Sequence, residues 1–480
     1  MIVLKFGGTS VGDSERVRSA AAIALAQPAP RVVVVSAATG VTNALLDAAK
    51  AAGRGEHDRV TEVVQHIHDR HAEILAGVQA DEIRAAAAAT IDGLHAALDA
   101  TLAEIEAAGT LTERLSDKVV STGEKCLSVL MSATIQDLGT PSVPVFADTV
   151  VATDDRHGAA RPDRALTRTR ADAVIRPLLN DGKTVVVTGF IGSGPDGSTT
   201  TLGRGGSDYS ATLLGAALNA DEVQIWTDVP GVLSADPRKV AKARIVPEIS
   251  YDEAQELAHF GAKVLHPRTI RPAVARNIPV HILSTFSPEE PGTVVTQEST
   301  GNRVKAVTAL RGLILLTLDV PELEDLAPAA SAVFRILDEE HVEIVTVSQA
   351  SSRRRMTFLI DGVMGGCARL QNRLEDELDD LEAHVSCSEH VAAVAAVGAG
   401  ASAQASSLST VLTTLHRAGV AILSTNQQTS NVAMLVVIPD QDADRAVAAL
   451  HERLIRPQIA SHRARRRRRS DLMAESFRVG

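Results

Sequence analysis

Short apolar runs recur along the first 295 residues and are separated by stretches of helical periodicity. Residues 2–6 and 31–35 are nearly continuous apolar runs, and residues 221–227, DEVQIWT, read as a further buried strand. A strand that is apolar on both faces is typical of a parallel sheet covered by helices. The pattern therefore predicts an α/β domain in which a parallel-rich central sheet has helices on both faces.

A second pattern begins after residues 287–304, which are rich in Pro, Gly, Glu and Ser. Beyond this break we expect the order strand, helix, strand, strand in 313–361 and the same order again in 391–438. The repetition predicts two ferredoxin-like βαββαβ units. These units could bind a ligand between paired sheets, or could serve only for dimerisation.

Residues 53–109 read as an inserted helical hairpin that carries His66, His68 and His71. Only His68 and His71 share a helix face, and no cysteine lies nearby in the sequence. Because metal sites require a defined set of ligands, we predict no metal bound by protein side chains.

Composition narrows the functional classes. The chain has 480 residues, of which 45% are hydrophobic and 2% aromatic, and its formal net charge is −11. The low aromatic content and the negative net charge argue against nucleic acid as a partner. The basic run of Arg463 and 465–469 is expected to be a solvated, disordered tail. No apolar run approaches the roughly 20 residues that a membrane helix requires, so we expect a cytoplasmic protein.

The three cysteines, Cys126, Cys367 and Cys387, are far apart in the sequence and form no CxxC pair. We therefore expect reduced thiols buried in the core, with no disulfide framework.

The residues that carry chemistry lie in two glycine-rich loops. Seven glycines occur from Gly189 to Gly206. Arg204 lies among the last of them, and Ser207 and Asp208 follow, with one or the other near the N-cap of an apolar helix. Backbone amides and an arginine can hold phosphate or carboxylate groups there. At the N-terminus a short strand delivers Lys5 into a turn containing Gly7 and Gly8. Neither loop is a Walker A loop or a Rossmann fingerprint.

Two further residues have alternative interpretations. Thr42 follows an apolar strand and either binds a ligand at the end of the sheet or caps a helix. Glu124 directly follows Gly123, which predicts a position at the start of a helix, where a carboxylate either complements the helix dipole or binds an ammonium group.

Five motifs, KFGGTSV, TTTLGRGGSDYSA, WTDVPG, ADPR and FGAKVLHPRT, occur in this order, and the chain resembles the aspartate kinases of the amino acid kinase family. The resemblance implies the amino acid kinase fold followed by two ACT units. It also implies transfer of the γ-phosphoryl group of ATP, with Mg²⁺, to the side-chain carboxylate of L-aspartate. The product would be 4-phospho-L-aspartate. This reaction would be the first step toward lysine, threonine and methionine, and the enzyme would be under allosteric control through its ACT domains.

The site residues implied by this resemblance fall into three groups. Catalysis is assigned to Lys5 and Asp208, and binding of aspartate to Thr42, Glu124, Arg204 and Ser207. The ATP-binding residues are Lys5, Gly7, Gly8, Ser10, Thr227, Asp228, Leu233, Arg238 and Lys263. The effector positions are Asp325, Glu343, Ser348 and Gln349.

The chain departs from the family pattern at two places. Leu233 stands where the motif has a tyrosine, and Val347, Ser348 and Gln349 stand where lysine-sensitive relatives have Thr-Ser-Glu. The feedback effector, lysine or threonine, is therefore left open. A homodimer or higher homo-oligomer through the ACT units is expected, because their sheet edges would otherwise be exposed.

Together these features predict a sequence of domains: a catalytic domain at 1–295, a linker at 296–306, ACT units at 307–388 and 389–458, and a tail at 459–480. We expect no fused homoserine dehydrogenase, because no dinucleotide-binding domain follows residue 460. Two alternatives remain: another amino acid kinase of the glutamate kinase type, and a regulatory subunit that senses amino acids without catalysis.

Overall fold

The computed structural model describes residues 1–261, 267–298, 301, 303–320, 326–350, 355–363, 366–381, 383–399, 405–427 and 432–455. The chain divides into two compact units. The first contains Met1–Leu233 and Ala243–Asn302, and the second contains Ser234–Lys242 and the chain from Arg303 onward. No helix in the described ranges is long and apolar enough to cross a membrane.

The first unit is built on a sheet in the strand order β3-β4-β2-β1-β7-β9-β10-β8 among the described residues. The first six strands in this order are mutually parallel, and β10 runs antiparallel to β9. The strands are β1 (Ile2–Phe6), β2 (Arg31–Val35), β3 (Ser142–Val145), β4 (Thr184–Thr188), β7 (Glu222–Thr227), β8 (Glu248–Ser250), β9 (Val280–Ser284) and β10 (Thr293–Thr296). The predicted parallel-rich sheet is confirmed.

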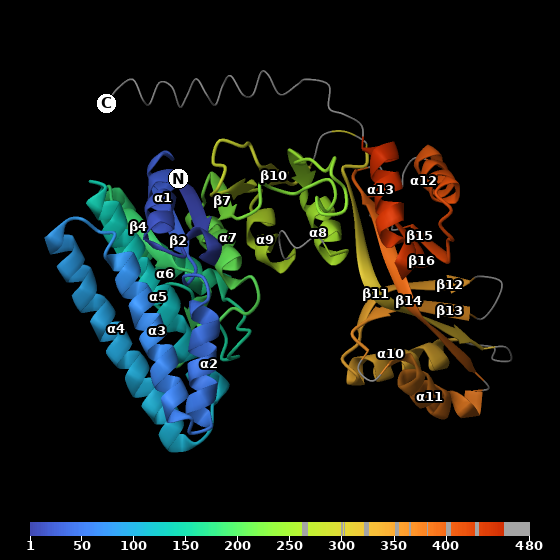
Figure 1. The fold of residues 1–480 in the computed structure, drawn as a ribbon, viewed down its shortest axis with the longest axis horizontal. Helices are drawn as coiled ribbons and strands as arrows, with labels where there is room; N and C mark the ends of the chain where they lie inside the picture. Colours follow the sequence, from blue (N-terminus) through green and yellow to red (C-terminus); the bar gives the residue numbers. More distant parts are fainter. Residues whose placement is uncertain are drawn as a thin grey trace. The chain divides into compact units, whose positions relative to one another are not determined.

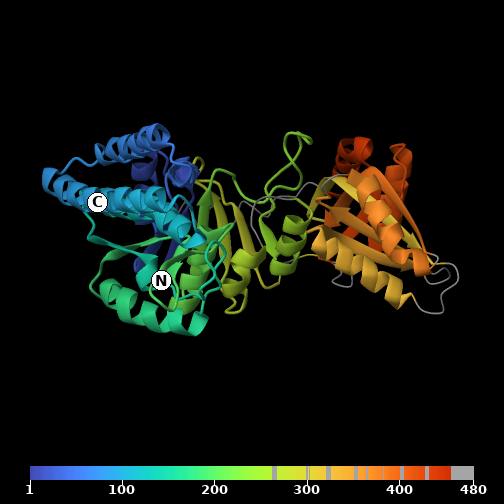
Figure 2. The ribbon, with the colours of Figure 1, turned by 90° about the horizontal axis from the view of Figure 1, so that it is seen from below.

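Helices cover both faces of this sheet, and Figures 1 and 2 show the helices of the N-terminal third gathered on one side. That group consists of α1 (Ser14–Leu25), α2 (Val41–Gly53), α3 (His57–Leu75), α4 (Asp81–Ala108) and α5 (Glu113–Asp137). The remaining helices of the unit are α6 (Arg164–Asn180), α7 (Gly206–Leu218), α8 (Tyr251–His259) and α9 (Pro267–Val274). A small hairpin of β5 (Ile191–Ser193) and β6 (Thr199–Thr201) precedes α7.

The alternation of side chains along β1 determines which groups reach the site. Leu4 and Phe6 belong to the core shared with α1–α5. Because successive side chains of a strand point to opposite faces, Lys5 lies on the other face, where α7 packs. The ion pair between Lys5 and Asp208 of α7 agrees with this placement.

The helix that carries Glu124 differs from the prediction. Glu124 lies in the middle of the 25-residue helix α5, not at its start. Gly123 does not interrupt the helix; a Cβ atom there would lie 2.8 Å from Cβ of Ala37 and 3.1 Å from Cγ1 of Val41. Glycine is therefore explained by the close approach of α5 to the end of β2 and the start of α2, and the helix-dipole interpretation of Glu124 is wrong.

The second unit contains a mainly antiparallel sheet in the order β12-β13-β11-β14-β16-β15 among the described residues. Its elements are β11 (Ala306–Asp319), α10 (Ala327–Glu339), β12 (Glu343–Ala350), β13 (Arg355–Asp361), α11 (Gly366–Leu378), β14 (His384–Val397), α12 (Ala405–Arg417), β15 (Ser424–Gln427), β16 (Ala433–Pro439) and α13 (Ala443–Leu454). In Figure 1, α10 and α11 lie at one end of this sheet and α12 and α13 at the other.

The two predicted repeats are joined through their longest strands. β11 and β14 have 14 residues each and pair antiparallel from Ala306 opposite Val397 to Asp319 opposite His384. β14 therefore runs across the predicted boundary between residues 388 and 389 and contributes to both repeats.

The cysteine prediction is wrong for one pair. Cys367 on α11 and Cys387 on β14 form a disulfide, with their Cα atoms 6.0 Å apart, whereas Cys126 is free and buried. The residues are 20 positions apart in the sequence, and only the packing of α11 on β14 brings them together.

Candidate active site

Lys5 lies at the centre of the parallel sheet. It pairs in register with Val34 of β2 and Ile225 of β7. Its side chain is about 10% exposed, and Nζ lies 2.6 Å from Oδ1 of Asp208 in the first turn of α7. A cation is thus held at the carboxyl end of the strands, where α/β proteins bind ligands.

The N-terminal loop has no room for side chains at its two glycines. A Cβ atom at Gly7 would lie 3.3 Å from Nζ of Lys5, and one at Gly8 would lie 2.9 Å from the carbonyl oxygen of Ala37. The Thr39 hydroxyl donates to the carbonyl of Gly8 at 2.7 Å. These contacts hold the backbone of the loop close to the lysine.

The second loop enters α7 through left-handed backbone. Gly205 is the N-cap residue, with φ of 71°, so Ser207 and Asp208 lie inside the first turn and neither is the N-cap. Gly189 packs directly on Ser207, because a Cβ atom at Gly189 would lie 2.7 Å from Cβ of Ser207. Similarly, Gly40 is the N-cap residue of α2, so Thr42 is not a capping residue.

An open cavity of about 480 Å³ is lined by the loop before α7 and by residues of β1, α2 and α5. It brings together the predicted residues Lys5, Thr42, Glu124, Arg204, Ser207 and Asp208, with Ser36, Phe190 and three glycines completing the lining. Residues from β1, α2, α5 and α7 therefore converge although Lys5 and Asp208 are 203 positions apart in the sequence.

Glu124 is the most unusual group in this cavity. It is 3% exposed, and its Oε2 atom has no hydrogen-bond partner among the described residues. Burial raises the pKa of Glu124 from 4.5 to about 8, while a hydrogen bond with the backbone of Ala37 acts in the opposite direction. An unpaired carboxylate in a desolvated position has a strong need for a cationic partner.

The cavity also offers groups for an anion. Arg204 is exposed and makes no ion pair within the part of the chain that the structure describes. The free N–H groups at the start of α7 point to the same region and favour negative charge. With Glu124, these groups match a ligand that carries both an ammonium group and carboxylates.

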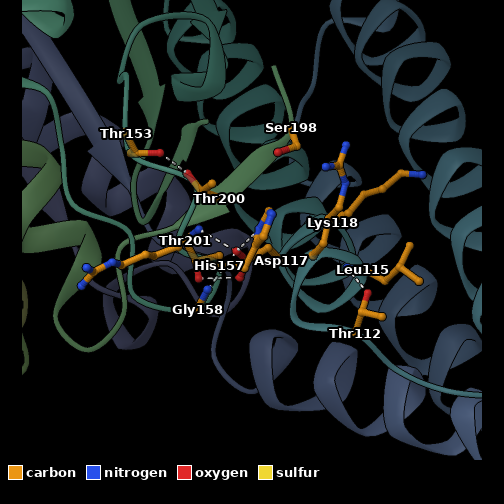
Figure 3. Close-up of polar contacts among 12 residues, drawn as sticks. Thr112, Leu115, Asp117, Lys118, Thr153, His157, Gly158, Ser198, Thr200 and Thr201 are labelled. Atoms are coloured by element: carbon orange, nitrogen blue, oxygen red, sulfur yellow. Dashed lines mark hydrogen bonds and ion pairs between the residues drawn. The ribbon is translucent and has the colours of Figure 1, made fainter. Parts of the chain in front are cut away.

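Asp117 supports this region from the same helix as Glu124 (Figure 3). Its Oδ2 accepts hydrogen bonds from His157 Nδ1 at 2.9 Å, Gly158 N at 3.0 Å and Thr201 N at 3.1 Å. Its Oδ1 accepts from the Thr201 hydroxyl at 2.6 Å. Asp117 thereby fixes the loop at 157–158 and β6 to α5, just before the loop that carries Arg204.

Sequence reasoning did not select Asp117 or Phe190. Phe190 lines the cavity with φ of 69°, an uncommon conformation for a residue with a bulky side chain, and its ring packs against Gly206. In the sequence, only the neighbouring Gly189 indicates that the backbone at Phe190 could have an unusual conformation. No spacing rule pointed to Asp117, since its partners lie 40 to 84 positions away.

The predicted nucleotide residues are only partly gathered. The Ser10 and Thr285 hydroxyls are hydrogen bonded at 2.9 Å, and Thr285 also donates to the carbonyl of Thr227. Thr227 in turn donates to Asp228 at 3.1 Å. These contacts join the loop after β1 to the ends of β7 and β9.

The other nucleotide positions are not brought to this cluster by the described contacts. Leu233 forms an isolated bridge with Ile245. Arg238 belongs to the second compact unit and is paired with Asp236. Lys263 lies outside the described residues.

Three of the predicted effector residues lie on β12. Glu343 and Gln349 are exposed, and Ser348 is half-buried opposite Thr357 of β13. Asp325 lies outside the described residues.

Comparison with known proteins identifies the family. A model of the amino acid kinase family matches residues 1–284, which include every residue that lines the cavity. The chain belongs to the amino acid kinase family. A model of the ACT domain matches residues 394–454 of this kinase.

The most informative relatives of this amino acid kinase are aspartokinases. It is 34% identical over 456 residues to lysine-sensitive aspartokinase 3 of Escherichia coli, covering 95% of this chain and 99% of that protein. It is 33% identical to a chloroplastic bifunctional aspartokinase/homoserine dehydrogenase of Zea mays, of which it spans 50%. The match to aspartokinase 3 thus extends over nearly the whole of both proteins.

Solved structures agree with this relationship. Crystal structures of E. coli aspartokinase III with aspartate and ADP, and with lysine and aspartate, match with TM-scores of 0.77 and 0.78 at 33% identity, covering 95% of this chain and 100% of theirs. The aspartate kinase of Clostridium acetobutylicum, at 22% identity and a TM-score of 0.79, shares the fold.

Proposed function

We propose that this amino acid kinase is an aspartate kinase, which transfers the γ-phosphoryl group of ATP to the side-chain carboxylate of L-aspartate. In this reaction a carboxylate oxygen forms a bond to the γ-phosphorus, the bond from that phosphorus to the bridging oxygen breaks, and ADP leaves. The products are 4-phospho-L-aspartate and ADP. The observation that carries the proposal is the buried carboxyl group of Glu124, whose Oε2 has no hydrogen-bond partner among the described residues, in the same cavity as Arg204 and the Lys5–Asp208 pair.

The division of charge in the cavity suits an amino acid with two carboxylates. Glu124 receives the substrate ammonium, and Arg204 binds a carboxylate with two parallel hydrogen bonds. Thr42 and Ser207 hydrogen-bond to the remaining polar atoms. The other carboxylate is left to face the phosphate donor at Lys5.

This reaction requires no catalytic base. A free aspartate side chain has a pKa near 3.9, so at neutral pH it is already an ionised nucleophile. Phosphoryl transfer needs in-line positioning and neutralisation of charge. Lys5 with the amides of Gly7 and Gly8 supplies positive groups for the β- and γ-phosphates, and Asp208 orients Lys5.

Ser10, Thr227, Asp228, Leu233, Arg238 and Lys263 are proposed to hold the rest of the nucleotide. The hydrogen bonds that link Ser10, Thr285 and Thr227 support this for the first three of these residues. Leucine at position 233 can pack against an adenine face without a ring.

Magnesium is proposed to arrive with the nucleotide. Of the two carboxylates that line the cavity, Asp208 is already paired with Lys5, and Glu124 lies on the substrate side. This donor set fits an ion held mainly by phosphate oxygens. When bound, Mg²⁺ neutralises charge on the transferring group, whereas the protein residues orient the two substrates.

Allosteric control through the ACT region is part of the proposal, with lysine or threonine as the effector and Asp325, Glu343, Ser348 and Gln349 as candidate contacts. E. coli aspartokinase III has been crystallised with lysine, which supports an amino acid as the effector. A homodimer or higher homo-oligomer through the ACT units, a cytoplasmic location and a place at the start of lysine, threonine and methionine synthesis complete the proposal.

A trapping assay tests the activity. The purified chain is incubated with MgATP, hydroxylamine and either L-aspartate or L-glutamate, and the acyl phosphate is detected as its coloured hydroxamate. We expect hydroxamate with aspartate alone, and inhibition by lysine or by threonine identifies the effector. Product from glutamate instead would indicate a glutamate kinase, and no product from a folded protein that binds effector would indicate a sensor.

A further inference from the structure

A second polar cluster lies within the helices of the first unit, apart from the cavity. His71 on α3, His95 on α4 and Cys126 on α5 are 0%, 9% and 0% exposed. Cys126 follows Glu124 by two positions, and at 3.6 residues per turn it points to roughly the opposite side of α5. The cluster is therefore not part of the substrate site.

The donor atoms of these three residues converge. Nδ1 of His71 lies 2.9 Å from Nε2 of His95, and one donor atom from each of the three side chains lies within 4.8 Å of the other two. His68, one turn before His71, stacks on His95 with ring centroids 3.8 Å apart. Three histidines and a thiol thus share one buried space between three helices.

The surroundings of the cluster are apolar. Ile67, Ile74, Ile91 and Leu98, which belong to the same helices, are buried in the core shared by α1–α5. The three donor groups are therefore polar atoms enclosed by hydrophobic side chains, where an unpaired polar group is costly.

One hydrogen bond does not satisfy this cluster. Nε2 of His71 and Nε2 of His68 are both buried and have no hydrogen-bond partner in the described part of the chain. Unsatisfied buried nitrogens are costly and uncommon, so the cluster is not a closed hydrogen-bond network. What indicates a ligand is the convergence of His71 Nδ1, His95 Nε2 and Cys126 Sγ.

We propose that His71, His95 and Cys126 bind one borderline-soft divalent transition-metal ion such as Zn²⁺. Imidazole and thiolate are the ligands that zinc prefers. Tetrahedral bonds of about 2.0–2.1 Å place two ligand nitrogens roughly 3.3 Å apart. This is close to the 2.9 Å that now separates Nδ1 of His71 from Nε2 of His95.

Binding of the metal ion displaces protons from its ligands. The ion takes the place of the proton shared between the two rings, which moves to another ring nitrogen, and the thiol proton of Cys126 is released to solvent. The site would join α3, α4 and α5, and α5 also carries Asp117 and Glu124. Its role is therefore structural support of the helix behind the substrate cavity.

Cobalt titration tests this site without reference to catalysis. The full-length, untagged chain is stripped with a chelator and titrated with Co²⁺, and a thiolate-to-cobalt charge-transfer band is recorded. We expect a band that saturates at one equivalent, disappears on addition of Zn²⁺, and is accompanied by release of one proton. A folded protein without the band overturns the proposal.

Matched variants locate the ligands. Cys126→Ser should abolish the charge-transfer band, and His95→Gln should weaken Co²⁺ binding by at least about 100-fold, since removing even an outer-shell partner costs 10- to 100-fold. Cys367→Ser and His66→Gln, which alter a cysteine of the other unit and an exposed histidine of α3, should leave the band unchanged. If Cys126→Ser fails to fold, a Zn²⁺-dependent rise in Tm of the wild type that His95→Gln lacks supports the site. A band that Cys367→Ser removes, or an equal Tm rise in His95→Gln, refutes it.

Discussion

Replacing Glu124 by glutamine should stabilise the ligand-free protein while weakening the binding of aspartate. The folded state raises the pKa of Glu124 from 4.5 to about 8. Between these two values the folded chain retains a proton that the unfolded chain has lost. The free energy of unfolding therefore falls as pH rises through this window, because the unfolded state binds fewer protons.

The size of this effect follows from the shift. Each pH unit in the window costs about 1.4 kcal/mol, so the wild type loses about 3 kcal/mol by pH 7 and about 5 kcal/mol above pH 8 relative to pH 4.5. Glutamine has no proton to lose. Any fixed cost of burying its amide is independent of pH, so the decisive quantity is how the difference between variant and wild type changes with pH.

The chain provides a local probe for this measurement. Trp226 is the only tryptophan of the sequence and lies buried on β7 of the first unit, so its fluorescence reports unfolding of the unit that contains Glu124. Urea unfolding would be followed at pH 5, 6, 7, 8 and 9 without ligands. We expect the stability advantage of Glu124→Gln to grow from pH 5 to pH 8 and to level off above it.

The same variant that is more stable should bind aspartate more weakly. At pH 7 a carboxyl group with a pKa of about 8 is roughly 90% protonated, so binding of the aspartate ammonium should release about 0.9 proton from the wild type and none from Glu124→Gln. Calorimetry in buffers of different ionisation enthalpy measures this number. Glu113→Gln, an exposed change on the same helix, is the control. If the difference in free energy of unfolding between wild type and Glu124→Gln is the same at all five pH values, the reasoning is refuted.

Three further predictions concern the same unit. Lys5→Met should lower kcat in the hydroxamate assay by about 10²- to 10³-fold while the Trp226 fluorescence stays native, because a preorganised charge at the transferring phosphate is removed; near-normal turnover would remove Lys5 from the mechanism. Gly123→Ala should lower the free energy of unfolding by about 1–3 kcal/mol because its Cβ meets Ala37, whereas Gly93→Ala, on the open face of α4, should raise it by about 0.5–1 kcal/mol, and equal urea midpoints for the two variants would contradict the packing argument. Asp117→Asn should lower the free energy of unfolding by about 1–3 kcal/mol and raise KM for aspartate more than it lowers kcat. The reason is that the new amide N–H group faces N–H and O–H groups that donate hydrogen bonds to Asp117. An unchanged KM would show that the network does not position the loop.

Much of this protein was predictable from local signals. The runs at 2–6 and 31–35 indicate buried parallel strands because four of the five side chains in each are apolar. The glycines around Lys5 and Arg204 indicate loops in which side chains would block close approach to the backbone. The five motifs, in their order, indicate the family relationship. The existence of these strands and helices, and six of the residues that line the cavity, could therefore be predicted from the sequence, whereas Phe190 could not.

Tertiary structure decided what depends on distant packing. Gly123 looked like a helix boundary, yet the approach of α5 to Ala37 explains it inside a continuous helix. The disulfide between Cys367 and Cys387 exists because α11 packs on β14, and the four-bond role of Asp117 depends on residues up to 84 positions away. The raised pKa of Glu124 and the meeting of His71, His95 and Cys126 have the same origin, since burial and proximity arise only when separate helices enclose a common volume.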